Sequence, residues 1–148
     1  MGLKVGENAP HFKLPSTGGS KFDLNELKEP LVLFFYPQDF TPGCTKEACS
    51  FRDNFDIFND LDVKVVGIST DSVAQHQKFK EKYNLPFELL ADQTGKVCKA
   101  YDAKVPFLNL AKRITYLIDG DKKIAAVYSN MFGAEKHIKK MISKISPN

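Results

Sequence analysis

The segment PLVLFFYPQDFTPGCTKEAC, residues 30–49, joins an apolar run to a cysteine-bearing helix start, and it decides the fold. Its apolar part, residues 30–37, is short and bounded by prolines, which predicts a buried β-strand. A helix is predicted from Pro42 to about Asn59, because three phenylalanines recur there at spacings of four and three. These core-facing positions are Phe51, Phe55 and Phe58.

The rest of the chain continues the alternation of strands and helices and then changes to a hairpin. The patterns predict strands at 63–70 and 87–92, helices at 72–84 and 94–101, a β-hairpin of 113–119 with 123–129, and an amphipathic helix at 133–145. Alternating units with right-handed crossovers give parallel strands, and the hairpin adds antiparallel ones. The sequence therefore predicts an α/β protein with a thioredoxin-like fold, in which helices flank a mixed central β-sheet.

The chain shows no internal repeat, low-complexity tract or linker, so we expect one domain spanning residues 1–148. Its net charge of +3 is too small to indicate a nucleic-acid or membrane partner. The longest apolar run, residues 31–36, is far shorter than a membrane helix, and the N-terminus lacks an apolar run of signal-peptide length. We therefore expect a cytoplasmic protein. Its three cysteines, an odd count, should be free, catalytic or metal-bound there rather than structural disulfides.

Cys44 stands at a helix start that is suited to activating a thiol. Thr41 is a good N-cap residue, Pro42 is favoured at the first helical position, and Gly43 allows close approach to the backbone. Unpaired N–H groups and the positive end of the helix dipole would then favour the thiolate form of Cys44. A reactive nucleophile is one interpretation, and a small buried apolar residue is the other.

Cys49 lies five residues after Cys44 on the same predicted helix. In an ideal helix, Cα atoms five residues apart are separated by roughly 8.6 Å. A disulfide requires roughly 4.4 to 6.8 Å, so the two cysteines could bond only if the first helical turns unwound. If both cysteines serve one reaction, the helix start must be a conformational switch.

With these residues in view, the sequence resembles the peroxiredoxins, and within them the bacterioferritin comigratory protein or peroxiredoxin Q type. The segment FFYPQDFTPGCTKEACSFRD, residues 34–53, looks like the signature of that family, and the resemblance extends through residues 67–92 and RITYLID, residues 113–119. It implies a thiol-dependent peroxidase that reduces hydrogen peroxide and organic hydroperoxides. It also implies a monomer without a cofactor.

The resemblance assigns both cysteines of the segment. It implies that Cys44 attacks the peroxide and becomes a sulfenic acid, and that Cys49 resolves it as an intramolecular disulfide. A thioredoxin or similar dithiol would then restore both thiols. By position, Arg113 matches the family's active-site arginine, Thr41 its hydroxyl donor and Pro37 its shielding proline.

Three further residues complete the predicted site. Glu47 matches an acidic residue that holds the arginine in related enzymes. Its charge would oppose ionisation of Cys44 unless it were paired, so its presence predicts a contact with Arg113. Gly43 and Phe40 are assigned to substrate binding, although ordinary packing would equally explain Phe40. Phe40 stands where many relatives carry a polar residue.

The remaining cysteine and the histidines are interpreted as ordinary residues. Cys98 matches nothing in the family motif and is expected to be a structural or incidental thiol. No metal site is expected, because Cys-x-x-x-x-Cys is not a usual zinc spacing and His11, His76 and His137 cluster with no other potential ligand. The sequence also places no histidine near Cys44 to act as a base, which argues against a cysteine hydrolase. His76 is expected to be solvated in a charged helix.

Two alternatives from other classes remain. A general thiol-disulfide oxidoreductase would prefer the closable Cys-x-x-Cys motif, which the chain lacks. A thioredoxin-like binding module would not need Arg113, Thr41 and Cys44 together.

Overall fold

The computed structural model describes residues 2–129 and 134–145 of the chain. Its main sheet has five strands in the order β5-β4-β3-β6-β7, and a separate small sheet pairs β1 with β2. The strands are β1 (Lys13–Pro15), β2 (Lys21–Asp23), β3 (Leu31–Phe35), β4 (Lys64–Ser69), β5 (Glu88–Ala91), β6 (Ile114–Ile118) and β7 (Ile124–Tyr128). The helices are the 3-10 helix η1 (Leu24–Glu26) and the α-helices α1 (Pro42–Asp53), α2 (Phe55–Asp60), α3 (Val73–Tyr83), α4 (Lys96–Ala100) and α5 (Ala134–Ile145).

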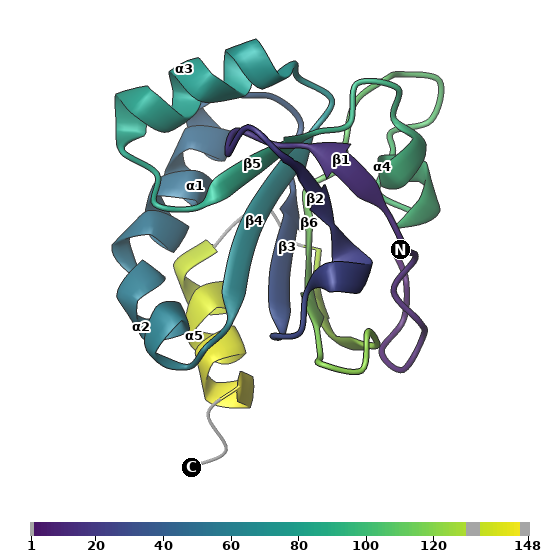
Figure 1. Cartoon of the computed structure of the whole chain (residues 1–148), viewed down its shortest axis with the longest axis vertical. Helices are drawn as coiled ribbons and strands as arrows, with labels where there is room; N and C mark the ends of the chain where they lie inside the picture. Colours follow the sequence, from purple (N-terminus) through teal and green to yellow (C-terminus); the bar gives the residue numbers. More distant parts are fainter. Residues whose placement is uncertain (1, 130–133, 146–148) are drawn as a thin grey trace.

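The central strand β3 has a parallel and an antiparallel neighbour. It pairs in parallel with β4 and antiparallel with β6. Beyond them, β4 pairs in parallel with β5, and β6 pairs antiparallel with β7. The predicted mixed sheet, with its late hairpin, is confirmed. Figure 1 shows α1, α2, α3 and α5 on one side of this sheet, and α4 with the β1–β2 pair on the other.

Both faces of β3 are covered, and all five of its residues are buried. Successive side chains of a strand point to opposite faces, so the strand contributes to two cores. One core contains Leu31, Leu33 and Phe35, and the other contains Val32, Phe34 and the following Tyr36. The two buried cysteines also lie in different cores, Cys98 in the first and Cys44 in the second.

The helix predicted from Pro42 to about Asn59 is divided in two at Asn54. The side-chain Nδ2 of Asn54 donates a hydrogen bond to the carbonyl of Ser50 at 2.8 Å. Asparagine side chains that compete for main-chain carbonyls favour helix ends over helix interiors, so α1 ends there and α2 begins anew. Phe51 and Phe58 are buried as predicted, whereas Phe55 is half-buried.

The other predicted elements are present with slightly shorter bounds. In α3, the Oγ of Ser72 accepts the Gln75 N–H at 3.1 Å and so caps the start of the helix. In α5, Ile138 and Met141 are buried and the described lysines are exposed, as the amphipathic pattern predicted. None of the helices in the described part of the chain has the length and apolar character needed to cross a membrane.

Candidate active site

The first turn of α1 follows the end of β3 after a short loop. Thr41 is the N-cap residue and Pro42 the first helical residue, as predicted. Cys44 lies in that turn with only 1% of its surface exposed. Its side chain packs in the core under α1, so the strand-to-helix connection delivers a thiol to a nearly closed position.

Arg113 lies beside Cys44 because of the pairing of β6 with β3. Ile114, the first residue of β6, is opposite Phe35, the last residue of β3, so the residue before it stands at the same end of the sheet. The Nη2 group of Arg113 donates to the Cys44 Sγ at 3.1 Å. A cationic donor at this distance stabilises a thiolate relative to a neutral thiol.

Glu47 holds the other side of the same guanidinium. Its Oε1 accepts from Arg113 Nη1 at 3.1 Å, and both side chains are almost fully buried. The predicted contact between these residues is confirmed. Burial raises the pKa of the Glu47 carboxyl to about 7, although the charge of Arg113 opposes that shift. Near neutral pH, Glu47 is therefore divided between its acid and its carboxylate form.

Gly43 allows the guanidinium to reach this position. A Cβ atom at residue 43 would lie 3.1 Å from Arg113 Nη2. That is closer than nine in ten real contacts of a Cβ atom, so with a side chain here the guanidinium would have to shift by a few tenths of an ångström. The group that comes close to the backbone at Gly43, as predicted, is the Arg113 guanidinium of the same chain.

Thr41 occupies the N-cap position without using its side chain as a cap. Its Oγ1 donates to the carbonyl of Gln38 at 2.9 Å, and it makes no side-chain bond to the helix start. The N–H groups of the first turn are therefore not covered by this hydroxyl and remain suited to an oxygen of a bound ligand.

Pro37 and Phe40 lie on two sides of the loop before α1. Pro37 and Arg113 line a groove of about 560 Å³, together with Val105, Leu110, Ala111, Lys112, Ile114 and Ser129. Phe40 has a left-handed backbone, with a φ of 67°. Its ring packs against Phe79 and Tyr83 of α3, at centroid distances of 5.2 and 6.4 Å. These ring contacts support the interpretation of Phe40 as a packing residue.

The two other cysteines differ in their surroundings. Cys49 is free and half-buried on α1, and it shares one unbroken helix with Cys44. Cys98 is fully buried on the opposite face of the sheet, where its backbone N–H donates to Asp92 Oδ2 at 2.8 Å. Burial, and then the Asp92 carboxylate, raise the pKa of the Cys98 thiol. This environment fits the predicted structural role.

The prediction that His76 is solvated is wrong. His76 is completely buried, and its Nδ1 lies 2.6 Å from Asp39 Oδ2. It stands three residues before the buried Phe79, so it belongs to the apolar face of α3 despite the charged residues around it. Within the described part of the chain, potential metal-binding atoms of Asp39, Asp71 and His76 lie within 4.8 Å of one another. The prediction that His76 clusters with no other potential ligand is therefore also wrong.

Comparison with known proteins identifies the family of this chain. The sequence pattern of the AhpC/TSA family matches residues 5–127. A peroxiredoxin bcp of Coxiella burnetii is 42% identical over 98% of this chain and all of its own length.

Two solved structures extend the comparison to the fold. Peroxidoxin BcpB from Mycobacterium tuberculosis is 38% identical, covers 98% of this chain and 97% of its own, and gives a TM-score of 0.91. A bacterioferritin comigratory protein of Xanthomonas campestris, described for its alkyl peroxide reduction, is 25% identical with a TM-score of 0.83. That match covers 92% of this chain and 90% of the other. The chain therefore belongs to the AhpC/TSA family and is a thiol-dependent peroxidase of the bacterioferritin comigratory protein and peroxiredoxin Q type.

Proposed function

We propose that Cys44 is the residue that reacts with peroxide. The observation that carries this proposal is the hydrogen bond of 3.1 Å from Arg113 Nη2 to the Cys44 Sγ. The thiolate attacks one peroxide oxygen, an S–O bond forms and the O–O bond breaks. The departing oxygen takes up a proton and leaves as water or an alcohol, and Cys44 is left as a sulfenic acid.

The groups around Cys44 accelerate this step mainly by placing charge and hydrogen-bond donors. Full ionisation of a thiol with an ordinary pKa of about 8.5 would increase the thiolate fraction at pH 7 only some 30-fold. Larger factors require donors that align the peroxide and stabilise charge on the leaving oxygen. Arg113 and the first-turn N–H groups of α1 are suited to this role, and Glu47 holds the guanidinium in place through Nη1. The Thr41 hydroxyl donates its proton to Gln38, so its oxygen is suited to accept a hydrogen bond from the peroxide.

Resolution by Cys49 requires part of α1 to unwind. In this step a Cys49 thiolate attacks the sulfenic sulfur, an S–S bond forms and the sulfenic oxygen leaves as water. The C-terminal half of α1 has a strong anchor, because the ring of Phe51 stacks on Phe34 at 4.6 Å. The exposed Pro42 and Gly43 have no such anchor, so we place the unwinding between residues 42 and 50.

The groove beside Arg113 supports activity toward organic hydroperoxides as well as hydrogen peroxide. Val105, Leu110 and Ile114 give it an apolar lining next to the guanidinium, which suits a hydroperoxide with a hydrocarbon tail. The Xanthomonas relative described for alkyl peroxide reduction agrees with this assignment.

The cycle closes when a thioredoxin-type dithiol reduces the bond between Cys44 and Cys49. A half-buried Cys49 on an unwound helix is accessible to such a partner. We further propose that the chain works as a monomer, as one domain of residues 1–148, in the cytoplasm, where its three free cysteines suit a reducing environment.

Mass spectrometry after peroxide treatment tests the assignment of both cysteines. The wild type should form a disulfide between Cys44 and Cys49, and Cys49→Ser should accumulate oxidised Cys44. Cys44→Ser should consume no peroxide. A disulfide that includes Cys98, or peroxide consumption by Cys44→Ser, would contradict the proposal. Size-exclusion chromatography with light scattering on both redox forms tests the monomer.

A further inference from the structure

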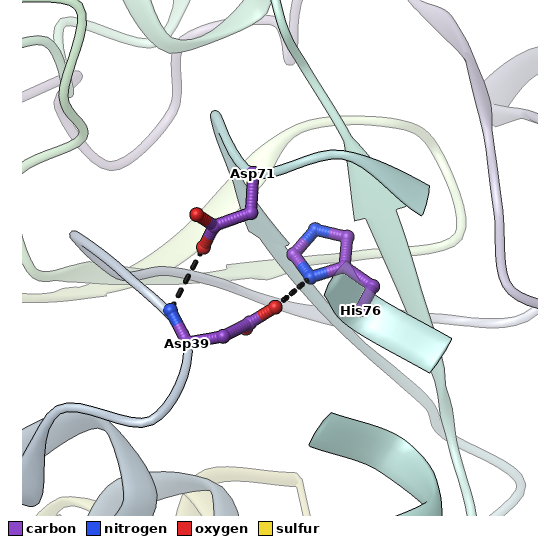
Figure 2. Close-up of side chains that lie close together, drawn as sticks. All are labelled: Asp39, Asp71 and His76. Atoms are coloured by element: carbon purple, nitrogen blue, oxygen red, sulfur yellow. Dashed lines mark hydrogen bonds and ion pairs between the residues drawn. The ribbon is translucent and has the colours of Figure 1, made fainter. Parts of the chain in front are cut away.

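A buried polar network lies behind the loop that leads from β3 to α1. Asp39, in that loop, and His76, on α3, have fully buried side chains, and their Oδ2 and Nδ1 atoms are 2.6 Å apart. Figure 2 shows Asp39 between His76 and Asp71, which follows β4. The Asp39 backbone N–H donates to Asp71 Oδ2 at 2.8 Å, and Ser69 Oγ donates to the same oxygen at 2.8 Å.

Counting the hydrogen-bond donors and acceptors shows where the protons of this network lie. His76 Nε2 lies 2.9 Å from the carbonyl oxygen of Leu90, which only accepts, so Nε2 carries a proton. Nδ1 faces the carboxyl oxygen of Asp39, so a second proton must lie between these two groups. The other oxygen of Asp39 accepts from the Tyr36 hydroxyl at 2.6 Å. Burial, and then the charge of Asp39, raise the pKa of Tyr36, which keeps this hydroxyl a donor. Asp39 and His76 thus form one proton-sharing unit tied to Tyr36.

A metal ion explains the same residues less well. Oxygen and nitrogen ligands of one tetrahedral zinc ion lie about 3.3 Å apart, whereas Asp39 Oδ2 and His76 Nδ1 are 2.6 Å apart. Among the described residues, no buried side-chain nitrogen or oxygen lacks a hydrogen-bond partner. The cluster is already complete as a hydrogen-bond network.

The network holds the loop immediately before the reactive turn. Phe40, next to Asp39, has a φ of 67°, a conformation that residues other than glycine rarely keep without support from their surroundings. Thr41, the N-cap of α1, follows directly, and Cys44 stands three residues beyond it. A displacement of Asp39 would therefore move the helix start relative to Arg113, which is held from a different strand.

We propose that Asp39 and His76 are positioning residues of the peroxidase reaction, which keep the loop of residues 37–41 in one place through both chemical steps. This inference rests on the proposed roles of Cys44 and Cys49. The network fixes one end of the segment that unwinds, and the ring of Phe51 fixes the other. The helix start consequently re-forms against Arg113 after each cycle.

Two substitutions of His76 separate its contact with Leu90 from those that Nδ1 makes with Asp39 and, at 3.3 Å, with the Tyr36 hydroxyl. In His76→Asn the amide nitrogen reaches the place of Nδ1 and keeps the bond to Asp39. In His76→Gln it reaches the place of Nε2 and keeps only the bond to Leu90. The rate of Cys44 oxidation by hydrogen peroxide is followed by quenched-flow mass spectrometry in the Cys49→Ser background, well below the Tm of each variant. We expect His76→Gln to lose about tenfold or more, and His76→Asn to stay within about threefold of the parent.

A matched pair of tyrosine variants keeps the test decisive if a histidine variant does not fold. Tyr36→Phe removes the hydroxyl that donates to Asp39 at 2.6 Å, and Tyr101→Phe removes one that donates to Pro10 O at 2.6 Å from the opposite core. Both should lower the Tm, and only Tyr36→Phe should slow Cys44 oxidation. Equal oxidation rates in this pair, or in the two histidine variants, would overturn the positioning role. The proposed function is tested separately in the same experiment, and it is wrong if the Cys49→Ser parent does not react with peroxide at Cys44.

Discussion

Cys44 and Cys98 are two buried cysteines in comparable places with opposite electrostatic surroundings. Both have at most 1% of their surface exposed, and each lies in the helix that follows a strand of the main sheet. Cys44 receives a hydrogen bond from Arg113, whereas Cys98 lies beside the carboxylate of Asp92. Burial is therefore the same for the two thiols, and what differs is the charge placed beside the sulfur.

The two cysteines differ because different strands of the sheet place different charged residues beside them. The chain segment before β6 brings Arg113 to the end of β3, while the end of β5 brings Asp92 toward α4. A cation favours the thiolate and an anion opposes it. One face of the sheet thus places a thiol beside a cation and the other places a thiol beside a carboxylate, and single substitutions can change one part of this contrast at a time.

Removing each thiol should give the largest difference. Cys44→Ala should reduce peroxide consumption by about a thousandfold or more, because Arg113 Nη2 bonds to the Cys44 sulfur and thiols without such activation react only slowly with peroxide. Cys98→Ala should keep the rate within about twofold and lower only the stability, because it leaves a small cavity. A thioredoxin-coupled peroxidase assay measures both rates. A substantial loss of rate in Cys98→Ala, at an unchanged folded fraction, would break the comparison.

Changing the cation should have the next largest effect. Arg113→Lys keeps a positive charge but cannot donate to Cys44 and Glu47 through a rigid fork. We expect the rate of Cys44 oxidation to fall about a hundredfold. Stopped-flow peroxide consumption under single-turnover conditions measures this rate, and Arg52→Lys, on the same helix as Cys44, serves as the control. A rate within about threefold of the wild type would show that charge alone is sufficient.

The sequence predicted most of this contrast because its signals are local. The position of Cys44 follows from the threonine, proline and glycine before it, which define a helix start. The strand and helix pattern was predictable because apolar periodicity reports the buried faces directly. The contact of Arg113 with Glu47 was predictable only with the family resemblance, because the two residues are 66 positions apart.

What the sequence did not show depends on packing between distant segments. His76 has charged neighbours along the chain, so its burial became visible only once α3 was placed against the loop of Asp39. The break at Asn54 was missed because the phenylalanine spacing continues across it. The side-chain direction of Thr41 also depends on the loop, since its hydroxyl bonds back to Gln38 rather than to the helix.

Glu47 should make the stability of the reactive face depend on pH. Its pKa is about 7 in the folded protein, against an ordinary value of 4.5 for a glutamate in the unfolded chain, so between these values the folded protein holds a proton that the unfolded chain has released. The unfolding free energy therefore falls as the pH rises through this window, by up to about 3 kcal/mol from this group. Glu47→Gln lacks the group, so the difference between the wild type and this variant should change by that amount between pH 4.5 and 8.

Urea unfolding of both proteins across this range measures the difference. Glu88→Gln is a suitable control, because its carboxylate is paired with Lys80 near the surface and its pKa is lowered rather than raised. Its contribution to stability should be lost as the pH falls, which is the opposite sign. Parallel stability curves for the wild type and Glu47→Gln would show that folding does not raise the pKa of Glu47.

Gly43→Ala should give the smallest effect and the sharpest geometric test. The added methyl would lie 3.1 Å from Arg113 Nη2, so the guanidinium must move by a few tenths of an ångström and its bond to Cys44 must lengthen. Alanine is also the better helix former, by about 1 kcal/mol, so the variant should be no less stable than the wild type. We expect Cys44 oxidation to slow by about three- to tenfold while the Tm stays the same or rises. Lys46→Ala, on the exposed side of the same turn, should change neither quantity. If Gly43→Ala kept the full rate, the 3.1 Å contact between Arg113 and Cys44 would not be what separates this cysteine from Cys98.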